Sequence, residues 1–130
     1  MSTVVDSSVI VAALVDTGPH GAWAEDVLSG GSLHAPELVR VEATNILRRL
    51  ERAKLITTPE ANGAQEDLMQ LDVDLFSFEP FADRIWELRH NLTAYDAAYL
   101  ALAEALKAPL VTRDAALAAT RGHTASVELL

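Results

Sequence analysis

Residues 3–15, TVVDSSVIVAALV, decide how the chain begins to fold. The first three residues are β-branched and favour a strand. Residues 8–15 are too long and too continuously apolar for a second strand, so they predict a buried helix. Asp6 then stands where the strand ends. The opening stretch therefore predicts a strand and a helix with a carboxylate at their junction.

Extended and helical segments continue to alternate along the chain. Gly and Pro residues, such as the break expected at Gly18-Pro19, separate segments without marking a domain boundary, and no repeat or low-complexity tract appears. We therefore expect a single domain, residues 1–130, of the α/β class, with a mostly parallel sheet between layers of helices. The other expected strands are residues 32–35, 73–78, 110–112 and 124–129, and the other expected helices are residues 22–28, 37–54, 60–71, 81–90, 93–107 and 114–120.

The composition excludes several classes of protein. The chain has 130 residues, a formal net charge of -9 and no cysteine, which removes disulfide bonds and thiol chemistry. The acidic excess argues against a nonspecific nucleic-acid binder, which usually presents a basic stripe. The longest apolar run, residues 9–15, is far short of the ~20 residues that a membrane-spanning helix needs, and the N-terminus is unlike a secretory leader. We therefore expect a cytoplasmic protein with no membrane contact.

Two carboxylates stand at the ends of predicted strands. Asp6 ends the first strand, and Asp114 follows strand 110–112 with one residue between. In open parallel sheets, ligands bind beyond the carboxyl ends of the strands. Each Asp also precedes a helix, and Asp is a favoured N-cap. For either residue taken alone, capping is the commoner role.

Two more carboxylates lie along apolar helix faces. Asp96 has Tyr99 and Leu100 three and four residues later, and Glu42 has Ile46 four residues later. An ionised carboxylate on a buried face costs several kcal/mol unless it is paired or binds a metal. No cation lies within reach of Glu42 on its own helix. A positive partner must therefore come from elsewhere in the fold or from solution.

Each of these two carboxylates also has a structural explanation. Asp96 can be the acidic member of a capping box that Thr93 opens, and Glu42 can pair with an arginine from another element. The functional explanation is that four acids from separate elements form a divalent-ion site. Mg²⁺ and Mn²⁺ take oxygen ligands and keep several waters, which leaves positions open for a phosphate. Such sites catalyse in-line hydrolysis of phosphodiester bonds.

Four segments, in order, resemble the PIN-domain nucleases and, in size and spacing, the VapC toxins of bacterial type II toxin–antitoxin pairs. They are VVDSSVIV at residues 4–11, Glu42 within a helix, YDAAYLALA at residues 95–103 and LVTRD at residues 110–114. The resemblance covers essentially the whole chain. It implies a PIN-like three-layer sandwich and an endoribonuclease that depends on Mg²⁺ or Mn²⁺. It also implies a homodimer that a small antitoxin neutralises by inserting a basic segment into the acidic site.

Carried over position by position, the resemblance assigns the catalytic and metal-binding acids to Asp6, Glu42, Asp96 and Asp114, which we call the acidic quartet. Some members of the family carry a further acid after the last of these, where this chain has alanines. A set of four ligands is therefore expected. We expect Asp6 and Asp96 to act most directly at the first metal, with the other two completing the site or positioning its waters.

Three residues are expected to support the quartet. Ser7 and Thr112 match the family's small hydroxyl positions, which would orient carboxylates, a water or a phosphate. Arg113 is the cation best placed to approach a phosphate or the site's own carboxylates. Because the rest of the chain is also acidic, substrate affinity should depend on bound metal and on RNA shape. This suggests a structured RNA such as a tRNA or a ribosomal RNA loop.

The histidines and tryptophans are expected to be structural. The four histidines have no metal-ligand spacing and are interpreted as ordinary surface or loop residues. Trp23 and Trp86 fall within helical patterns, where packing is favoured over base stacking, and Trp86 is expected to turn inward. The histidines are His20, His34, His90 and His123.

Two other functions remain as alternatives. A receiver-like phosphoacceptor domain has a similar length and binds Mg²⁺ near a first-strand Asp. Such domains carry paired acids after that strand and a Lys after the last one, whereas Val5 precedes Asp6 here and Lys107 precedes its strand. The second alternative is a catalytically idle PIN domain that only binds another protein. RNA cleavage tested with and without a chelator would distinguish all three.

Overall fold

Five short strands form one parallel sheet in the computed structural model, which describes all 130 residues. The strands are β1 (Ser2–Val5), β2 (Ser32–Pro36), β3 (Asp74–Phe76), β4 (Leu110–Thr112) and β5 (Val127–Leu129). Their order in the sheet is β3-β2-β1-β4-β5, and every neighbouring pair is parallel. The predicted α/β class is therefore confirmed.

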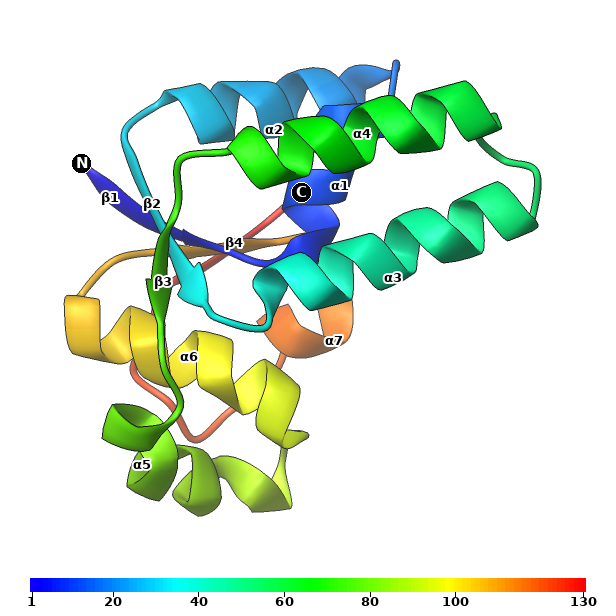
Figure 1. The fold of residues 1–130 in the computed structure, drawn as a ribbon. Helices are drawn as coiled ribbons and strands as arrows, with labels where there is room; N and C mark the ends of the chain where they lie inside the picture. Colours follow the sequence, from blue (N-terminus) through cyan, green and yellow to red (C-terminus); the bar gives the residue numbers. More distant parts are fainter.

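Helices cover both faces of this sheet. Figure 1 shows α1, α2 and α4 above the strands and α5 and α6 below them, which gives three layers. None of these helices is long and apolar enough to cross a membrane. The α-helices are α1 (Ser7–Val15), α2 (Pro19–Ser29), α3 (Val39–Arg52), α4 (Thr58–Gln70), α5 (Ala82–Glu87), α6 (Ala94–Leu106) and α7 (Ala115–Ala118), and two 3₁₀ turns, η1 (Glu79–Phe81) and η2 (Leu88–His90), flank α5.

The opening stretch folds as its pattern predicts. Val4 and Val5 are fully buried in β1, and α1 follows after a single residue. That residue, Asp6, has extended backbone angles and accepts a hydrogen bond from the Val9 N–H, so it is the N-cap of α1. The buried residues of α1 include Ile10, which joins the main hydrophobic core. This junction fixes the direction in which the Asp6 carboxylate leaves the sheet.

The strand order places a topological switch point between β1 and β4. The chain moves to one side of β1 through β2 and β3, and later to the other side through β4 and β5. Ligand sites of open α/β sheets lie at this point, beyond the carboxyl ends of the strands. Asp6 follows β1 and Asp114 follows β4. Receiver domains have the flavodoxin-like order 2-1-3-4-5, so the receiver-like alternative is wrong for this chain.

The largest departure from the predicted elements lies in residues 79–90. The expected continuous helix is divided into η1, α5 and η2, and Trp86 is 66% exposed instead of turned inward. Ile85 and Leu88 supply the buried face of this segment, and Trp86 points away from it, where the Arg89 guanidinium lies 4.2 Å from the centre of its ring. The prediction was wrong because so short a helix buries only one narrow face. Trp23, in contrast, packs against the second core cluster as expected.

Smaller corrections concern element ends and one histidine. The strands expected at residues 73–78 and 124–129 are only three residues long, and Pro19 begins α2 instead of breaking the chain. His34 is not a surface residue. It lies in β2 with its side chain only 12% exposed, near the Phe76 ring.

Candidate active site

Asp6 is the most buried of the four acids and is only 6% exposed. Its Oδ1 accepts hydrogen bonds from the Ser8 hydroxyl at 2.5 Å and from the Val9 N–H at 3.2 Å, while Oδ2 accepts one from the Thr112 hydroxyl. Burial raises the pKa of Asp6, and these hydrogen bonds oppose that rise only in part. Ionisation of Asp6 therefore destabilises the folded protein.

Two hydroxyl groups connect Asp6 to the segment after β4. The Thr112 hydroxyl donates to Asp6 and accepts from the Asp114 N–H at 3.0 Å. The Ser8 hydroxyl likewise donates to Asp6 and accepts from the Arg113 N–H at 3.2 Å. Each hydroxyl thus fixes both the first carboxylate and the backbone that carries the last one. Sequence reasoning found Thr112 but missed Ser8, although its place in the first turn after Asp6 was a usable signal.

Asp114 is both the N-cap of α7 and a site candidate. Its Oδ1 accepts from the backbone N–H groups of Ala116 at 2.9 Å and Leu117 at 3.1 Å. Its Oδ2 has no hydrogen bond within the protein, and the residue is exposed. The cap therefore uses one oxygen and leaves the other free to bind a ligand.

Glu42 and Tyr99 meet across the site. The Tyr99 hydroxyl donates to Oε1 of Glu42 at 2.6 Å. Burial raises the pKa of Glu42, and the negative charges of Asp6 and Asp96 raise it further, while the hydrogen bond from Tyr99 lowers it. No arginine pairs with Glu42, since the ion pairs of the protein lie elsewhere. The alternative explanation of Glu42, an ion pair with an arginine, is therefore wrong.

Asp96 completes the group from the first turn of α6. Its backbone N–H donates to the Thr93 hydroxyl at 3.3 Å, but the reciprocal bond of a capping box, from the Thr93 N–H to the Asp96 carboxylate, is absent. Burial raises the pKa of Asp96, and the charges of Asp114 and Asp6 raise it further. A side-chain hydrogen bond with Thr93, the N-cap of the helix, opposes this rise only in part, so the Asp96 carboxylate lies at its helix end and is also repelled by the other acids.

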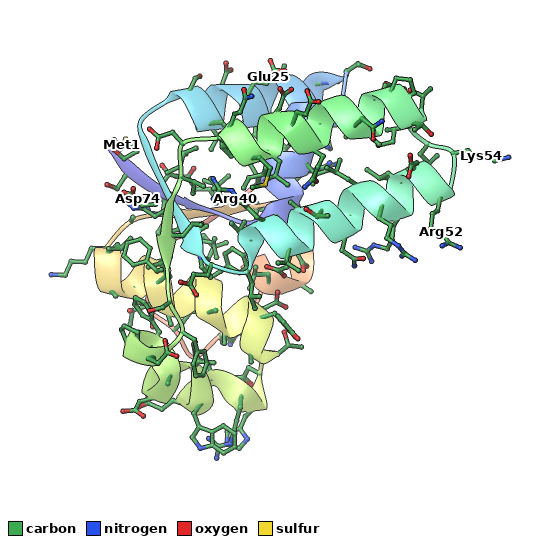
Figure 2. The ribbon with its side chains drawn as sticks, viewed as in Figure 1. Met1, Glu25, Arg40, Arg52, Lys54 and Asp74 are labelled. Atoms are coloured by element: carbon green, nitrogen blue, oxygen red, sulfur yellow. The ribbon has the colours of Figure 1, made fainter.

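No ion pair of the protein includes a carboxylate of the quartet. Arg52 and Lys54 extend from the far end of α3, away from the sheet (Figure 2). The Arg113 guanidinium contacts His20 at 2.6 Å and lies 3.9 Å from Asp16, so the expectation that it approaches the site's own carboxylates is wrong. The four acids therefore repel one another, and no basic side chain of the protein neutralises them. A bound cation would supply the missing positive charge.

The donor set fits a hard divalent cation in its chemistry, although no three His, Asp or Glu side chains stand where they could together hold a metal ion. Mg²⁺ usually keeps several waters and takes only one or two carboxylates directly. Oxygen atoms of Asp114 and Glu42 that carry no hydrogen bond could supply such contacts. The quartet could therefore hold a hydrated ion, with other acids reaching it through its waters.

The sequence itself matches the PIN-domain family over residues 3–122. The chain belongs to this family. Ribonuclease VapC9 of Mycobacterium tuberculosis is 39% identical over 117 residues, which cover 90% of this PIN domain and 89% of VapC9. The resemblance seen in the four sequence segments is thereby confirmed.

Solved structures agree with the fold of this PIN domain. PAE2754 from Pyrobaculum aerophilum superposes with a TM-score of 0.73 at 22% identity, covering 98% of this chain and 83% of that one. VapBC2 from Rickettsia felis, crystallised with a DNA fragment from its promoter, gives a TM-score of 0.69 at 15% identity, covering 100% and 99%. At such identities the likeness concerns the fold alone, and it confirms the predicted PIN-like sandwich.

Ser7, the other predicted hydroxyl of this PIN domain, does not bond to a carboxylate of the quartet. Its side chain instead hydrogen-bonds Tyr99, which lowers the pKa of the Tyr99 hydroxyl. Burial, the largest effect, and the hydrogen bond to Glu42 raise this pKa by much more. The phenol therefore stays protonated and remains a hydrogen-bond donor to Glu42. Tyr99 was named in the sequence only as an apolar neighbour of Asp96, so its polar role was missed.

Replacing Thr112 with Val tests the bridge between Asp6 and Asp114. Thr112 is fully buried, and Val keeps its shape but leaves Asp6 without one donor and the Asp114 N–H without its acceptor. We expect the free energy of unfolding at pH 7 to fall by about 1–3 kcal/mol, measured by urea denaturation. Thr112→Ser keeps the hydroxyl and should lose less. An equal loss in both variants would mean that the methyl group, and not the hydroxyl, matters.

Proposed function

We propose that this PIN domain, as a single domain of residues 1–130, is an endoribonuclease toxin of the VapBC type. It hydrolyses RNA phosphodiester bonds at the acidic quartet with Mg²⁺ or Mn²⁺. The observation that carries the proposal is that four acids from four elements gather at the switch point of the sheet without a cation among them. The names of its relatives, VapC ribonucleases at up to 39% identity, support it.

The protein's own groups have separate tasks in this reaction. Asp6, fixed by two hydroxyls and a backbone N–H, would hold the ion or one of its waters at a fixed position. Asp114 and Glu42 each offer one oxygen without a hydrogen bond within the protein, and Asp96 would bind waters of the ion. When bound, the ion acidifies a water and neutralises the charge that develops on the phosphate. Asp6, Glu42, Asp96 and Asp114 are therefore the proposed catalytic residues.

RNA reaches this site against an unfavourable overall charge of -9. Substrate recognition must therefore depend on the shape of the RNA and on local contacts. Arg113 is the proposed phosphate contact, because it follows Thr112 directly and is only partly engaged by Asp16 and His20. A structured target, such as a tRNA or a ribosomal RNA loop, suits these requirements. Cellular RNA as substrate also implies a cytoplasmic location.

The proposed partners are a second copy of the chain and an antitoxin. An apolar cavity of about 280 Å³ opens beside Glu42, and Leu38, Phe78 and Tyr95 in its lining are all exposed. A basic segment with apolar side chains would match both this cavity and the neighbouring carboxylates. VapBC-5 from Mycobacterium tuberculosis, a structural neighbour with a TM-score of 0.56, is by name a member of the VapBC family of toxin–antitoxin systems. An antitoxin that covers the quartet would block access to RNA.

Incubation of the purified protein with total RNA tests the activity. We expect fragments in the presence of Mg²⁺ or Mn²⁺ and no cleavage after EDTA treatment, because the carboxylates alone supply no activated water. Restoring the ion should restore the fragments. Cleavage that persists in EDTA would contradict the metal-dependent mechanism, and no cleavage under any condition would favour the idle, protein-binding PIN domain.

A further inference from the structure

One side chain, Tyr99, joins the two helices that carry Glu42 and Asp96. The hydroxyl of Tyr99, on α6, donates to Oε1 of Glu42, on α3, at 2.6 Å. This is the only hydrogen bond between the two helices. Asp96 lies three residues before Tyr99 on α6, nearly one helical turn away. The Glu42 carboxylate is therefore hydrogen-bonded to the helix that carries Asp96 through a single phenol.

Tyr99 is well suited to hold a fixed position. It is 2% exposed and belongs to the main hydrophobic core, together with Ala97 and Leu100 of the same helix. A ring packed in this way cannot move without displacing its neighbours. Its hydroxyl is therefore a donor at a defined point, and not a flexible surface group.

Glu42, in contrast, is under repulsion. Asp6 and Asp96 act on it as like charges, and it is partly removed from solvent. No other hydrogen bond within the protein restrains its carboxylate. Without Tyr99 the side chain would be free to turn away from the other acids. The bond to Oε1 prevents this and leaves Oε2 available.

We propose that Tyr99 is a positioning residue of the nuclease site, which holds the Glu42 carboxylate through Oε1 and so keeps Oε2 available to a divalent cation or one of its waters. This inference rests on the proposed function and assigns part of it to a residue outside the quartet. Tyr99 itself touches neither substrate nor metal. It acts only through Glu42.

The substitution Tyr99→Phe removes the hydroxyl and keeps the buried ring. We expect the dissociation constant for Mn²⁺, measured by calorimetry without RNA, to rise about 10-fold, as is typical when a partner of a metal ligand is lost. The kcat for RNA cleavage should fall, while the KM for RNA stays unchanged because Tyr99 does not reach the substrate. Ser29→Ala is the control for loss of a hydroxyl, since the Ser29 hydroxyl is exposed at the end of α2, donates only to the backbone carbonyls of Glu25 and Asp26, and contacts no residue of the quartet.

A double-mutant cycle separates positioning from packing. In a Glu42→Gln background the acidic group that Tyr99 holds is gone, so adding Tyr99→Phe should not weaken Mn²⁺ binding further. Equal weakening in both backgrounds would show a general packing effect and overturn the inference. Unchanged Mn²⁺ binding in Tyr99→Phe would also overturn it, while the proposed function would stand. A wild-type protein that neither binds Mn²⁺ nor cleaves RNA would refute both.

Discussion

Replacing Asp6 with Asn is expected to abolish metal-dependent RNA cleavage while the domain stays folded and becomes more stable. Asn has nearly the same shape, and its Oδ1 can accept the hydrogen bonds from Ser8 and from the Val9 N–H. Its NH2 group takes the place of Oδ2 and can donate to the Thr112 hydroxyl, which then accepts instead of donating. Asn cannot offer an anionic oxygen to a cation. We expect the cleavage rate to fall by about 10³-fold or more, as for other groups that act at reacting atoms.

The stability of this variant should change in the opposite direction. Burial makes the ionised form of Asp6 unfavourable at pH 7 even with its hydrogen bonds. A neutral amide removes that cost. The free energy of unfolding of the metal-free variant should therefore rise by about 0.5–2 kcal/mol, the usual range for a single stabilising substitution. Urea denaturation in EDTA measures this gain, and gel analysis of RNA measures the loss of cleavage.

Asp72→Asn is a suitable control for the Asp6 variant. Asp72 is exposed and makes no ion pair, and its replacement changes the net charge by the same amount. The control should cleave RNA at the wild-type rate and show nearly the wild-type stability. Full cleavage by purified Asp6→Asn protein would remove Asp6 from the catalytic assignment.

The stability of the metal-free protein is expected to fall as the pH rises above about 4, the ordinary carboxylate range. Asp6, Glu42 and Asp96 all have pKa values that are raised in the folded state. Between their unfolded and folded pKa values the native state binds more protons than the unfolded state, so the free energy of unfolding decreases with pH. The loss is complete once the pH exceeds the folded values. The same charges that make the site useful therefore destabilise the empty fold at neutral pH.

Denaturant titrations from pH 4 to pH 8 in EDTA would measure this slope, and the Asp6→Asn variant should show a shallower one. Glu104 behaves in the opposite way, because hydrogen bonds from Arg84 lower its pKa to about 2. Its stabilising contribution is present above about pH 4.5 and is lost only as the pH falls toward 2. The two effects are separated because they occupy different pH ranges. An identical slope in the wild type and the variant would mean that general charge repulsion is the cause.

Addition of Mn²⁺ at pH 7 should reverse the destabilisation. An ion that binds only the native state at 100 times its dissociation constant adds about 2.7 kcal/mol to the free energy of unfolding. The gain should shrink toward pH 4, where protons compete for the same oxygens. Asp6→Asn should lose most of it, while the Asp72→Asn control should keep it.

The fold could be predicted from local patterns because they were strong. The β-branched run before Asp6 and the continuous apolar run after it produced β1 and α1 with their capping residue at the expected place. Pairing of the strands followed from the parallel α/β rule. Trp86 shows the limit of this reasoning, because a helical pattern does not tell which face of a short helix the rest of the protein covers.

The acids of the site were visible in the sequence, but most of their partners were not. The unexpected partner of Glu42 is Tyr99, which lies 57 residues away, and the partner of Arg113 is His20, which lies 93 residues away. Spacing along one helix carries no information about such pairs, since they depend on how whole elements pack. The catalytic roles of the quartet stay predictions. The structure shows where the four side chains lie, and sequence similarity shows the family of the chain, but neither measures the rate of RNA cleavage.

The connection between Asp6 and Thr112 spans 106 residues. A growing polypeptide on the ribosome therefore carries its first site acid long before it carries the strand that pairs with β1 and holds that acid in place. Until this late strand is added, the half-made chain lacks Asp114 and any enclosed cation site. Enclosure of Asp6 therefore depends on a contact between an early and a late segment of the chain, and no fragment that ends before β4 can assemble the quartet.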